Sequence, residues 1–449
     1  MSIRKVPLEP LALNAAVFLL LALSLTVPSG YSWGAVLLLV LGLMRWPAVL
    51  RGRVAWPREM RAWAVTILLM GLVWSMHIVV NGKLITHSLG LDRSIKYLLV
   101  FLLLPALLDR RPSDTALNWG CWIGAWGAGL TALWQVGVLG WDRAAGYTNA
   151  IQFGNLALLL GAWSGVRAMQ APVRWQKVFG WLALLMGVVA SIASGSRGGW
   201  LTLPALMLLG FWFSAPPPAS SSQALPRALK AAGVTLAACM ALLALPPVQQ
   251  RIDIGIHEWR AHEQRAEDTS VGLRRSFWSL ALQIGEAHPW IGAGQHGYEA
   301  MQKEAVSRKE IPEAALGYNH AHNEWLDMFA KRGLLGVAGL ALFFAVPGVM
   351  FARGLRGRSH VRSGSSSPLE DRTDAGTPQN DPSPASPRTD TQRAAALCGL
   401  MTVLAFVGFG LTQVMFAHNN GTMIYLLAVT LWIACMQPAH ANASLPTER

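Results

Sequence analysis

The chain has 449 residues, of which 53% are hydrophobic and only 14% are charged. This balance excludes an ordinary soluble globular protein of that size. The net charge of +13 would suggest nucleic-acid binding in a soluble protein, but here the excess falls in loops between apolar runs, so no nucleic-acid partner is expected. The sequence predicts an all-α, polytopic membrane protein.

Apolar runs of membrane-spanning length follow one another along the chain. Most are free of charge over roughly 17 residues or more, which is about what a helix needs to cross a bilayer. Many of the 20 tryptophans lie near the ends of these runs, where amphipathic rings favour the lipid interface. We expect about 12 transmembrane helices, at residues 10–27, 31–48, 61–80, 94–109, 114–138, 148–168, 176–194, 198–214, 228–245, 332–353, 394–414 and 419–437.

Two long polar stretches interrupt these runs. The later one is rich in Pro, Ser and Asp and too poor in large apolar residues to form a core, so a disordered loop is predicted, with a shorter linker of this kind at residues 214–222. The four cysteines lie inside apolar runs without a CxxC pair, so no disulfide framework is expected. The expected parts are residues 1–245 with nine spans, a polar domain at 246–331, span 332–353, a disordered loop at 354–393, spans within 394–437, and a tail at 438–449.

The charge of the loops predicts an orientation. Basic loops, such as the one from Arg45 to Arg61, fall on the same side as both termini, which the positive-inside rule makes cytoplasmic. Residues 246–331 fall on the opposite side, with nine Lys or Arg against twelve Asp or Glu. This segment is therefore expected to be a large helical domain in the periplasm, carrying the active site.

Arg197 lies at the outer end of the seventh run, in Ser194-Gly-Ser-Arg-Gly-Gly-Trp200. A guanidinium group keeps its proton and offers a planar fork of donors, which suits a phosphate or diphosphate. The small residues around Arg197 are expected to leave it open to a ligand. The alternative is an interfacial arginine that reaches toward water.

The polar domain contains Arg274 and Arg275 near the start of a helix predicted over residues 271–287, which Pro289 ends. In the first turn of a helix the backbone field favours an anion, although solvated surface charges are an equally ordinary interpretation. The following Gly292-Ala-Gly-Gln-His-Gly297 matches GxGxxG, but no strand accompanies it, and a turn is predicted instead. His288 and His296 are expected in turns or at the surface.

His320 and His322 lie just before another predicted helix, with Asn323 as its N-cap and Gly333 as a break before the tenth span. An imidazole there can take a proton from a sugar hydroxyl near neutral pH. The HxH pair could instead bind a metal, but no further ligands are evident, and two purely structural histidines are the other alternative.

Three short motifs follow in this order along the chain: Ser194-Gly-Ser-Arg197-Gly-Gly; Arg274 to Trp278 leading to His288-Pro-Trp-Ile-Gly-Ala-Gly294; and His322-Asn-Glu-Trp-Leu326 with Arg332-Gly-Leu-Leu-Gly336. Together they resemble the O-antigen ligase and polymerase superfamily. The resemblance implies an inverting membrane glycosyltransferase of the C type that needs neither metal nor other cofactor. Its donor would be an O-antigen linked to undecaprenyl diphosphate, and the ligases, which the chain resembles most, use the lipid A core oligosaccharide as acceptor at the periplasmic face of the bacterial inner membrane.

The resemblance also implies roles for individual residues. Arg197 and Arg274 would hold the donor diphosphate, and His322 would be the general base that activates the acceptor hydroxyl. Arg275 could replace Arg274, and His320 could replace His322. His418, with Asn419 and Asn420 at the outer end of the eleventh run, is a further polar cluster without an assigned role.

Three other functions are compatible with the sequence. A glycan polymerase and a protein O-oligosaccharyltransferase share the motifs and differ in the acceptor. A transporter or flippase would use the arginines to guide a lipid-linked anion. That interpretation predicts several charged residues inside the spans, whereas the charges here cluster at the outer ends and in one polar segment.

Overall fold

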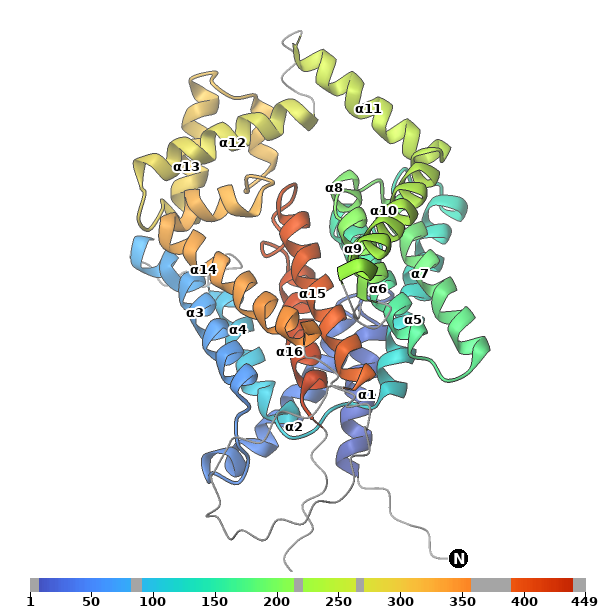
Figure 1. Ribbon diagram of the computed structural model, residues 1–449. Helices are drawn as coiled ribbons and strands as arrows, with labels where there is room; N and C mark the ends of the chain where they lie inside the picture. The colour runs from blue at the N-terminus through green and yellow to red at the C-terminus, as the bar shows by residue number, and fades with distance from the viewer. Residues whose placement is uncertain (1–7, 82–90, 214–220, 264–269, 357–388, 439–449) are drawn as a thin grey trace, which may run out of the picture.

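The computed structural model describes residues 8–81, 91–213, 221–263, 270–356 and 389–438. These residues form helices and turns but no strand, which confirms the all-α prediction (Figure 1). The elements are α1 (Leu8–Ala22), α2 (Tyr31–Leu50), α3 (Arg58–Asn81), α4 (Leu91–Leu103), the 3-10 helix η1 (Leu104–Leu107), α5 (Asp114–Leu133), the π-helix η2 (Trp134–Val138), α6 (Ala150–Met169), α7 (Arg174–Ser194), α8 (Arg197–Trp200), α9 (Leu203–Phe213), α10 (Ser221–Leu243), α11 (Pro246–Glu263), α12 (Ser270–Ala287), α13 (Gly294–Ser307), the 3-10 helix η3 (Glu313–Gly317), α14 (Glu324–Arg356), α15 (Asp390–Gly410) and α16 (Asn419–Met436).

Seven helices in the described residues are long and apolar enough to cross a membrane, namely α2, α3, α7, α10, α14, α15 and α16. The chain is therefore a multi-pass membrane protein. The other predicted spans also coincide with helices, but these are shorter or less apolar, so the count of about 12 stays a prediction. One predicted span, 198–214, is broken: turn residues 201 and 202 separate α8 from α9.

The centre of the helix bundle is α16, nearly all of whose residues are buried. It packs against α15, and both lie in the middle of the bundle (Figure 1). Some polar groups in this interior are paired across helices: Trp63 Nε1 donates to Thr430 Oγ1 at 2.8 Å, and Tyr425 OH donates to the Phe343 carbonyl at 2.9 Å. Such pairing matters because an unbonded polar group is costly where no water can replace the partner.

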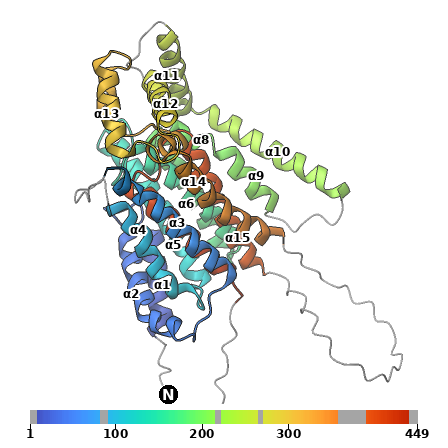
Figure 2. The same ribbon diagram turned by 90° about the vertical axis from the view of Figure 1, so that its left-hand side faces the viewer.

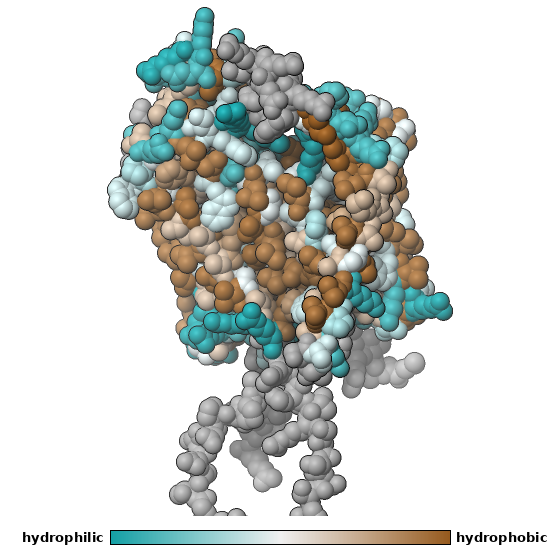
Figure 3. All heavy atoms as spheres, turned by 45° about the horizontal axis from the view of Figure 1, so that its top comes forward, coloured by the Kyte–Doolittle hydropathy of each residue, from teal (hydrophilic) through white to brown (hydrophobic). Residues whose placement is uncertain are grey.

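The outer faces of the bundle expose large apolar side chains, such as Leu72 on α3 and Leu236 on α10. Figure 3 shows a broad hydrophobic surface with hydrophilic residues above and below it. This arrangement would be costly in water but is the one that a surrounding bilayer stabilises. Inside the bundle, α6 and α7 approach closely, since a Cβ added at Gly187 would lie 2.8 Å from Gly161 Cα.

A second, smaller hydrophobic core lies at one end of the bundle, at the upper left of Figure 1. We call residues 270–331, which form α12, α13, η3 and the first part of α14, the head unit. Its core includes Phe277, Ile284, Tyr298 and Ala330, all almost fully buried. The apolar residues of α12 that contribute to it repeat at helical spacing, as the sequence predicts for residues 271–287.

The head unit is joined to the bundle at Gly333, where α14 is kinked with φ 61° and ψ −159°. The turn after α12 packs against this kink through backbone hydrogen bonds: Ala293 N donates to the Ala330 carbonyl at 2.9 Å, and Leu334 N donates to the Pro289 carbonyl at 2.7 Å. A Cβ at Gly292 would lie 2.3 Å from Arg332 N, so only glycine fits there. The predicted break at Gly333 is thus confirmed.

The GxGxxG match is only partly a turn. Gly292 and Gly294 have positive φ and shape the turn, but α13 begins at Gly294 and continues past Gly297. The interpretation as a turn was therefore wrong for the second half of the motif. Gly292 allows the turn to pack against the α14 kink, and Gly297 leaves room for Ala293.

The predicted disordered loop at 354–393 also needs correction at both ends. α14 continues to Arg356, and α15 begins at Asp390, where Thr389 and Gln392 form a reciprocal capping box. Residues 357–388 lie outside the described residues. Most of the shorter linker at 214–222 does as well, and α10 already begins at Ser221.

The polar domain predicted at 246–331 consists of two parts, α11 and the head unit. α11 extends above α7 and α10 at the upper right of Figure 1 and meets the head unit at α12. It contacts α7, α10 and α12, and none of the residues in the head-unit core comes from it. Residues 270–331 alone share one hydrophobic core.

Candidate active site

A cavity of about 200 Å³ lies where the head unit meets the bundle. Arg197, Arg274 and His322, which lie 77 and 48 positions apart in the sequence, all line it. The turn between α7 and α8, the start of α12 and the loop before α14 each contribute to its wall. The other lining residues are Arg143, Ile151, Gly195, Ser196, Gly198, Leu273, Phe277, Tyr318 and Thr412.

Arg197 is held by the tight turn that ends α7. Gly195 takes a left-handed conformation with φ 62°, and Ser196 Oγ donates to Asn155 Oδ1 on α6 at 2.8 Å. Across the site, Arg197 Nη1 donates to the carbonyl of Arg251 on α11 at 3.3 Å. The guanidinium group therefore lies between the bundle and α11.

The glycines beside Arg197 have a different purpose from the predicted one. A Cβ added at Gly198 would lie 1.9 Å from Thr412 Oγ1, and one at Gly199 would lie 2.4 Å from Asn155 Oδ1. The two glycines thus make room for neighbouring side chains, which lets this turn pack tightly on α6 and on the segment after α15. They fix the turn that carries Arg197, whose side chain lines the cavity.

Arg274 and Arg275 differ in their exposure and in their position relative to the cavity. Arg274 is half-buried and lines the cavity, whereas Arg275 is exposed and is not among the lining residues. Because α12 begins at Ser270, both arginines lie just after its first turn and not within it. The predicted contribution of the helix N-terminus is therefore weaker than the sequence suggested.

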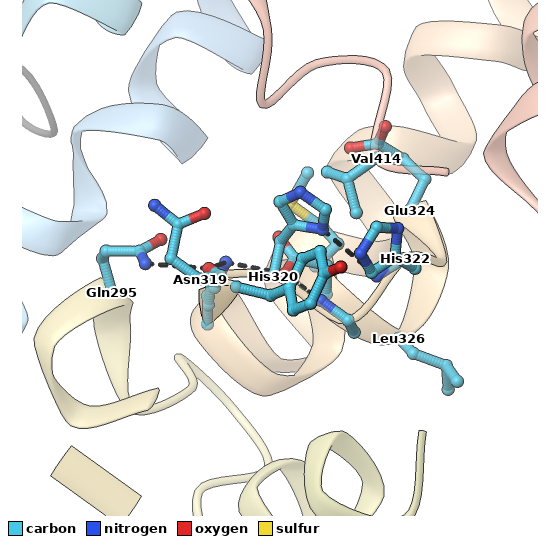
Figure 4. A network of polar contacts seen from close by, with 12 residues as sticks. Gln295, Asn319, His320, His322, Glu324, Leu326 and Val414 are labelled. Atoms are coloured by element: carbon cyan, nitrogen blue, oxygen red, sulfur yellow. Dashed lines mark hydrogen bonds and ion pairs between the residues drawn. The ribbon is translucent and has the colours of Figure 1, made fainter. Parts of the chain in front are cut away.

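His322 and His320 are also placed differently. His322 lines the cavity, with Phe277 stacked on its ring at a centroid distance of 5.6 Å and Tyr318 edge-on at 5.1 Å. His320 lies behind it, 8% exposed, with the two imidazole centroids 4.3 Å apart (Figure 4). Of the two, only His322 can meet a molecule bound in the cavity.

The backbone at His322 is unusual, with φ 50°, a region that residues other than glycine seldom adopt. Its N–H donates to His320 Nδ1 at 3.4 Å. Directly after it, Asn323 Oδ1 accepts from Trp325 N at 3.0 Å and from Leu326 N at 3.2 Å, which confirms Asn323 as the N-cap of α14. Strained conformations of this kind are characteristic of functional sites.

All three histidines near the cavity are held neutral. Burial, followed by the charge of Arg274, lowers the pKa of His322 to about 4. Burial, followed by the charge of His322, lowers the pKa of His320 to about 3, and burial followed by the charge of Arg93 lowers that of His418 to about 4. At pH 7 each imidazole therefore has a nitrogen lone pair that can accept a proton.

His418 lies beside this pair but not in the cavity wall. Its ring centroid is 5.8 Å from that of His320, and its Nδ1 is 3.5 Å from the amide nitrogen of Asn149, the N-cap of α6. His418 thus links the start of α16 to the start of α6. In the described residues, no group of three or more His, Cys, Asp or Glu is arranged to hold a metal ion.

Two arginines of the site were not singled out in the sequence. Arg143 lines the cavity from the loop before α6, and its Nε donates to the Ser194 carbonyl at 2.7 Å. Arg251 on α11 donates from Nη2 to the Asp142 carbonyl at 3.1 Å. Burial, together with the charges of Arg251, Arg197 and Arg274, lowers the pKa of Arg143, so these cations share one electrostatic environment.

An apolar pocket of about 320 Å³ adjoins the cavity, and Arg197 lines both. Its walls come mainly from α7, α9, α10 and α11, with residues such as Val188, Leu203 and Leu242. Those three residues also line a further apolar pocket of about 440 Å³ between α6, α7, α9 and α10. α9 and α10 run together along one side of the bundle (Figure 2). A cationic cavity is thus adjoined by one apolar pocket, which shares lining residues with a second apolar pocket.

Comparison with known proteins gives two findings. Residues 182–341 match the family model described as O-Antigen ligase, and this range contains Arg197, Arg274 and His322. The chain is also similar to an uncharacterized protein of Haemophilus influenzae (strain Rd), with 23% identity over 439 residues, which cover 94% of this chain and 97% of that protein.

Proposed function

Residues 182–341 place this chain in the O-antigen ligase superfamily, and from this premise we propose that it is an O-antigen ligase. In this proposal it transfers a polysaccharide from undecaprenyl diphosphate to the lipid A core oligosaccharide during lipopolysaccharide synthesis. The reaction inverts the anomeric centre and needs no metal ion or other cofactor. The protein works in the bacterial inner membrane with its active site at the periplasmic face.

The observation that carries the proposal is the shared cavity of Arg197, Arg274 and His322. Glycosyl transfer from a lipid diphosphate needs cations that stabilise the departing diphosphate and a base that takes the proton of the attacking hydroxyl. The cavity offers arginines for the first task and a neutral imidazole for the second. A transporter or flippase forms no glycosidic bond and therefore does not require a base at an attacking hydroxyl.

The chemical step follows from these positions. The acceptor hydroxyl oxygen forms a bond to the anomeric carbon of the donor sugar while the bond from that carbon to the diphosphate oxygen breaks. The leaving diphosphate keeps the electron pair and meets the charges of Arg197, Arg274 and Arg143, and the hydroxyl proton passes to His322. Since negative charge grows on the diphosphate during this step, the arginines stabilise the transition state more than the bound donor.

The apolar pockets support a lipid-linked donor. A diphosphate in the cationic cavity lies beside Arg197, and the adjoining pocket behind Arg197 is lined almost wholly by apolar side chains. A polyprenyl chain can enter that pocket and continue between α6, α7, α9 and α10. A free sugar nucleotide would not use these apolar walls.

The expected location rests on charge and on the position of the head unit. The head unit lies at one end of the bundle, and the basic loop between α2 and α3 lies at the other (Figure 1). Since basic loops stay on the cytoplasmic side, the head unit and the cavity would face the periplasm.

The proposal is tested with purified protein in detergent, a lipid-linked O-antigen and lipid A core as acceptor. Polysaccharide-capped lipopolysaccharide should form in the presence of EDTA. His322→Ala should lower kcat by about a thousandfold because the general base is lost. His296→Ala, which changes an exposed histidine of α13, should retain wild-type activity.

The acceptor is tested in parallel. A second lipid-linked glycan and a pilin-like protein are offered in separate reactions, and lipid A core should be the preferred acceptor. Preference for the glycan or the protein would instead identify the chain as an O-antigen polymerase or a protein O-oligosaccharyltransferase. Movement of lipid-linked glycan across a vesicle membrane without transfer would contradict the enzyme proposal as a whole.

A further inference from the structure

An ion pair is buried beneath the cavity, on the first part of α14. Lys331 Nζ lies 2.6 Å from Asp327 Oδ1, and the two side chains are 2% and 3% exposed. Neither residue lines the cavity. Burying two charges costs several kcal/mol each in lost hydration, and the mutual attraction often does no more than offset that cost. A buried pair of this kind is thus weak evidence for stability alone.

Each charge of this pair also bonds the backbone of the loop that carries the histidines. Asp327 Oδ1 accepts from Ala321 N at 3.0 Å, and Lys331 Nζ donates to the Asn319 carbonyl at 2.8 Å. These two contacts lie on either side of His320, and Ala321 immediately precedes His322. The ion pair thus holds the loop at Asn319 and Ala321, the two residues that flank His320.

Other groups of the head unit complete this arrangement. Gln295 Nε2 also donates to the Asn319 carbonyl, at 3.0 Å (Figure 4). Gln302 Nε2 donates to the carbonyls of Ala315 and Tyr318 at 2.9 and 3.0 Å, and the Lys331 ammonium lies 4.8 Å from the centre of the Tyr298 ring. Several side chains thus form hydrogen bonds to the backbone of this loop. Among them, the charged side chains Asp327 and Lys331 bind the residues nearest to His322.

These hydrogen bonds to the loop can hold His322 in its unusual backbone conformation. A left-handed conformation at a residue other than glycine costs on the order of 1–3 kcal/mol and persists only where the surroundings enforce it. The conformation is observed at His322, and the backbone N–H just before it is held by Asp327.

We propose that Asp327 and Lys331 are positioning residues that hold the 319–322 loop and keep the His322 imidazole in the cavity. This inference rests on the proposed function, in which His322 is the general base. The order of the two charges matters, because a backbone N–H of the loop faces the carboxylate of Asp327 and a backbone carbonyl faces the ammonium group of Lys331. A pair that served only to neutralise charge would not need those two contacts.

The test compares two substitutions that remove the same charge. Asp327→Asn keeps an acceptor oxygen for Ala321 N, whereas Asp327→Leu removes both the charge and the acceptor. We expect kcat to fall within about 10-fold for the asparagine variant and by about 100-fold for the leucine variant, since small displacements of catalytic groups have effects of that size. Equal losses in the two variants would overturn the positioning role.

A matched control separates positioning from the loss of a buried cation. Lys331→Met removes the ammonium below the cavity, and Arg167→Met removes an equally buried cation that pairs with Asp114 at 2.7 Å, remote from the cavity. Both should lower the unfolding temperature. Lys331→Met alone should lower kcat of the folded fraction by about 100-fold, and an equal loss of kcat in Arg167→Met would contradict the proposal.

A second readout does not depend on glycosyl transfer. Diethyl pyrocarbonate acylates neutral imidazoles, and mass spectrometry reports the rate at His322 separately from that at exposed His296. The His322 rate should change several-fold in Asp327→Leu and Lys331→Met and stay near wild type in Asp327→Asn and Arg167→Met, with the His296 rate unchanged in all four. If wild-type protein transfers no glycan but this pattern appears, the proposed function fails and the positioning role stands. An unchanged His322 rate in both Asp327→Leu and Lys331→Met overturns the positioning role even where transfer is normal.

Discussion

The two walls of the cavity are built in different ways. On the bundle side, Arg197 is fixed by close packing, in which Gly198 and Gly199 leave no space for a side chain of their own. On the head-unit side, His322 lies in a strained loop that side chain to backbone hydrogen bonds hold in place. In the proposed function, the phosphate-binding group thus comes from a rigid scaffold, while the proposed base depends on a loop whose geometry is set by a few polar contacts.

The largest expected loss of activity concerns the head-unit wall and its two adjacent arginines, Arg274 and Arg275. Arg274→Gln should lower kcat/KM by about 100- to 1000-fold, the cost of removing a donor that meets developing negative charge. Arg275→Gln should stay near wild type, because Arg275 is exposed and does not line the cavity. Steady-state kinetics with the lipid-linked donor give both values. A larger loss at Arg275 would mean that α12 presents its other face to the donor.

The close packing of the bundle wall is tested at Gly199. A Cβ there would lie 2.4 Å from Asn155 Oδ1, so Gly199→Ala should destabilise the protein by about 1–3 kcal/mol and displace the turn that holds Arg197. Gly233→Ala is the matched control, since a Cβ at this helical glycine of α10 meets nothing within 4 Å. Thermal unfolding and donor KM measure the effect. Similar stability in the two variants would show that the turn is not tightly packed.

The pH dependence gives a smaller effect that concerns the head-unit wall. The pKa of His322 is lowered to about 4, so the unbound protein keeps this proposed base neutral well below pH 6. The acidic limb of kcat/KM, which reports groups of the free enzyme, should therefore lie near pH 4. The limb of kcat should lie at higher pH, because a bound diphosphate offsets the charge of Arg274 that lowers the pKa of His322. A kcat/KM limb near pH 6.5, with the same position for kcat, would contradict the buried site.

The same histidines make stability depend on pH in a definite direction. A histidine whose folded pKa is below its unfolded value near 6.5 binds protons more readily when unfolded. His322, His320 and His418 thus leave stability intact above about pH 6.5 and lower it as the pH falls toward 4. Thermal unfolding between pH 7.5 and 4, at about half-unit steps, records the decline. A triple variant with glutamine at all three positions should show a shallower decline.

Much of this arrangement was predictable from local sequence patterns. The apolar repeat of α12, the N-cap at Asn323 and the break at Gly333 each depend on a few neighbouring residues, and all three are present. The site residues Arg197, Arg274 and His322 came from motifs, and the structure brings them to one cavity. Composition alone indicated a membrane protein, and several helices have the length and hydropathy required.

Other features depend on contacts that no local pattern encodes. Arg143 is a single arginine in a loop, and only the fold places its guanidinium group beside Arg197. The pairing of Gly292 with the α14 kink joins segments forty residues apart, so the sequence reveals the glycines but not their partner. Nor does the HxH pattern say which histidine faces the cavity, because that depends on the backbone conformation at His322. Arg143 lies in the loop between η2 and α6, far from the three motifs in the sequence, so no motif points to it.

The central claim is that the bundle wall and the head-unit wall bind one diphosphate. A double-mutant cycle measures this most directly, with kcat/KM for the lipid-linked donor determined for Arg197→Gln, Arg274→Gln and the double variant. If both guanidinium groups act on one diphosphate, the double variant should lose less than the sum of the single losses, with a coupling energy of at least about 1 kcal/mol. Strictly additive losses, within about 0.5 kcal/mol, would mean that the two arginines act independently and would contradict a single site.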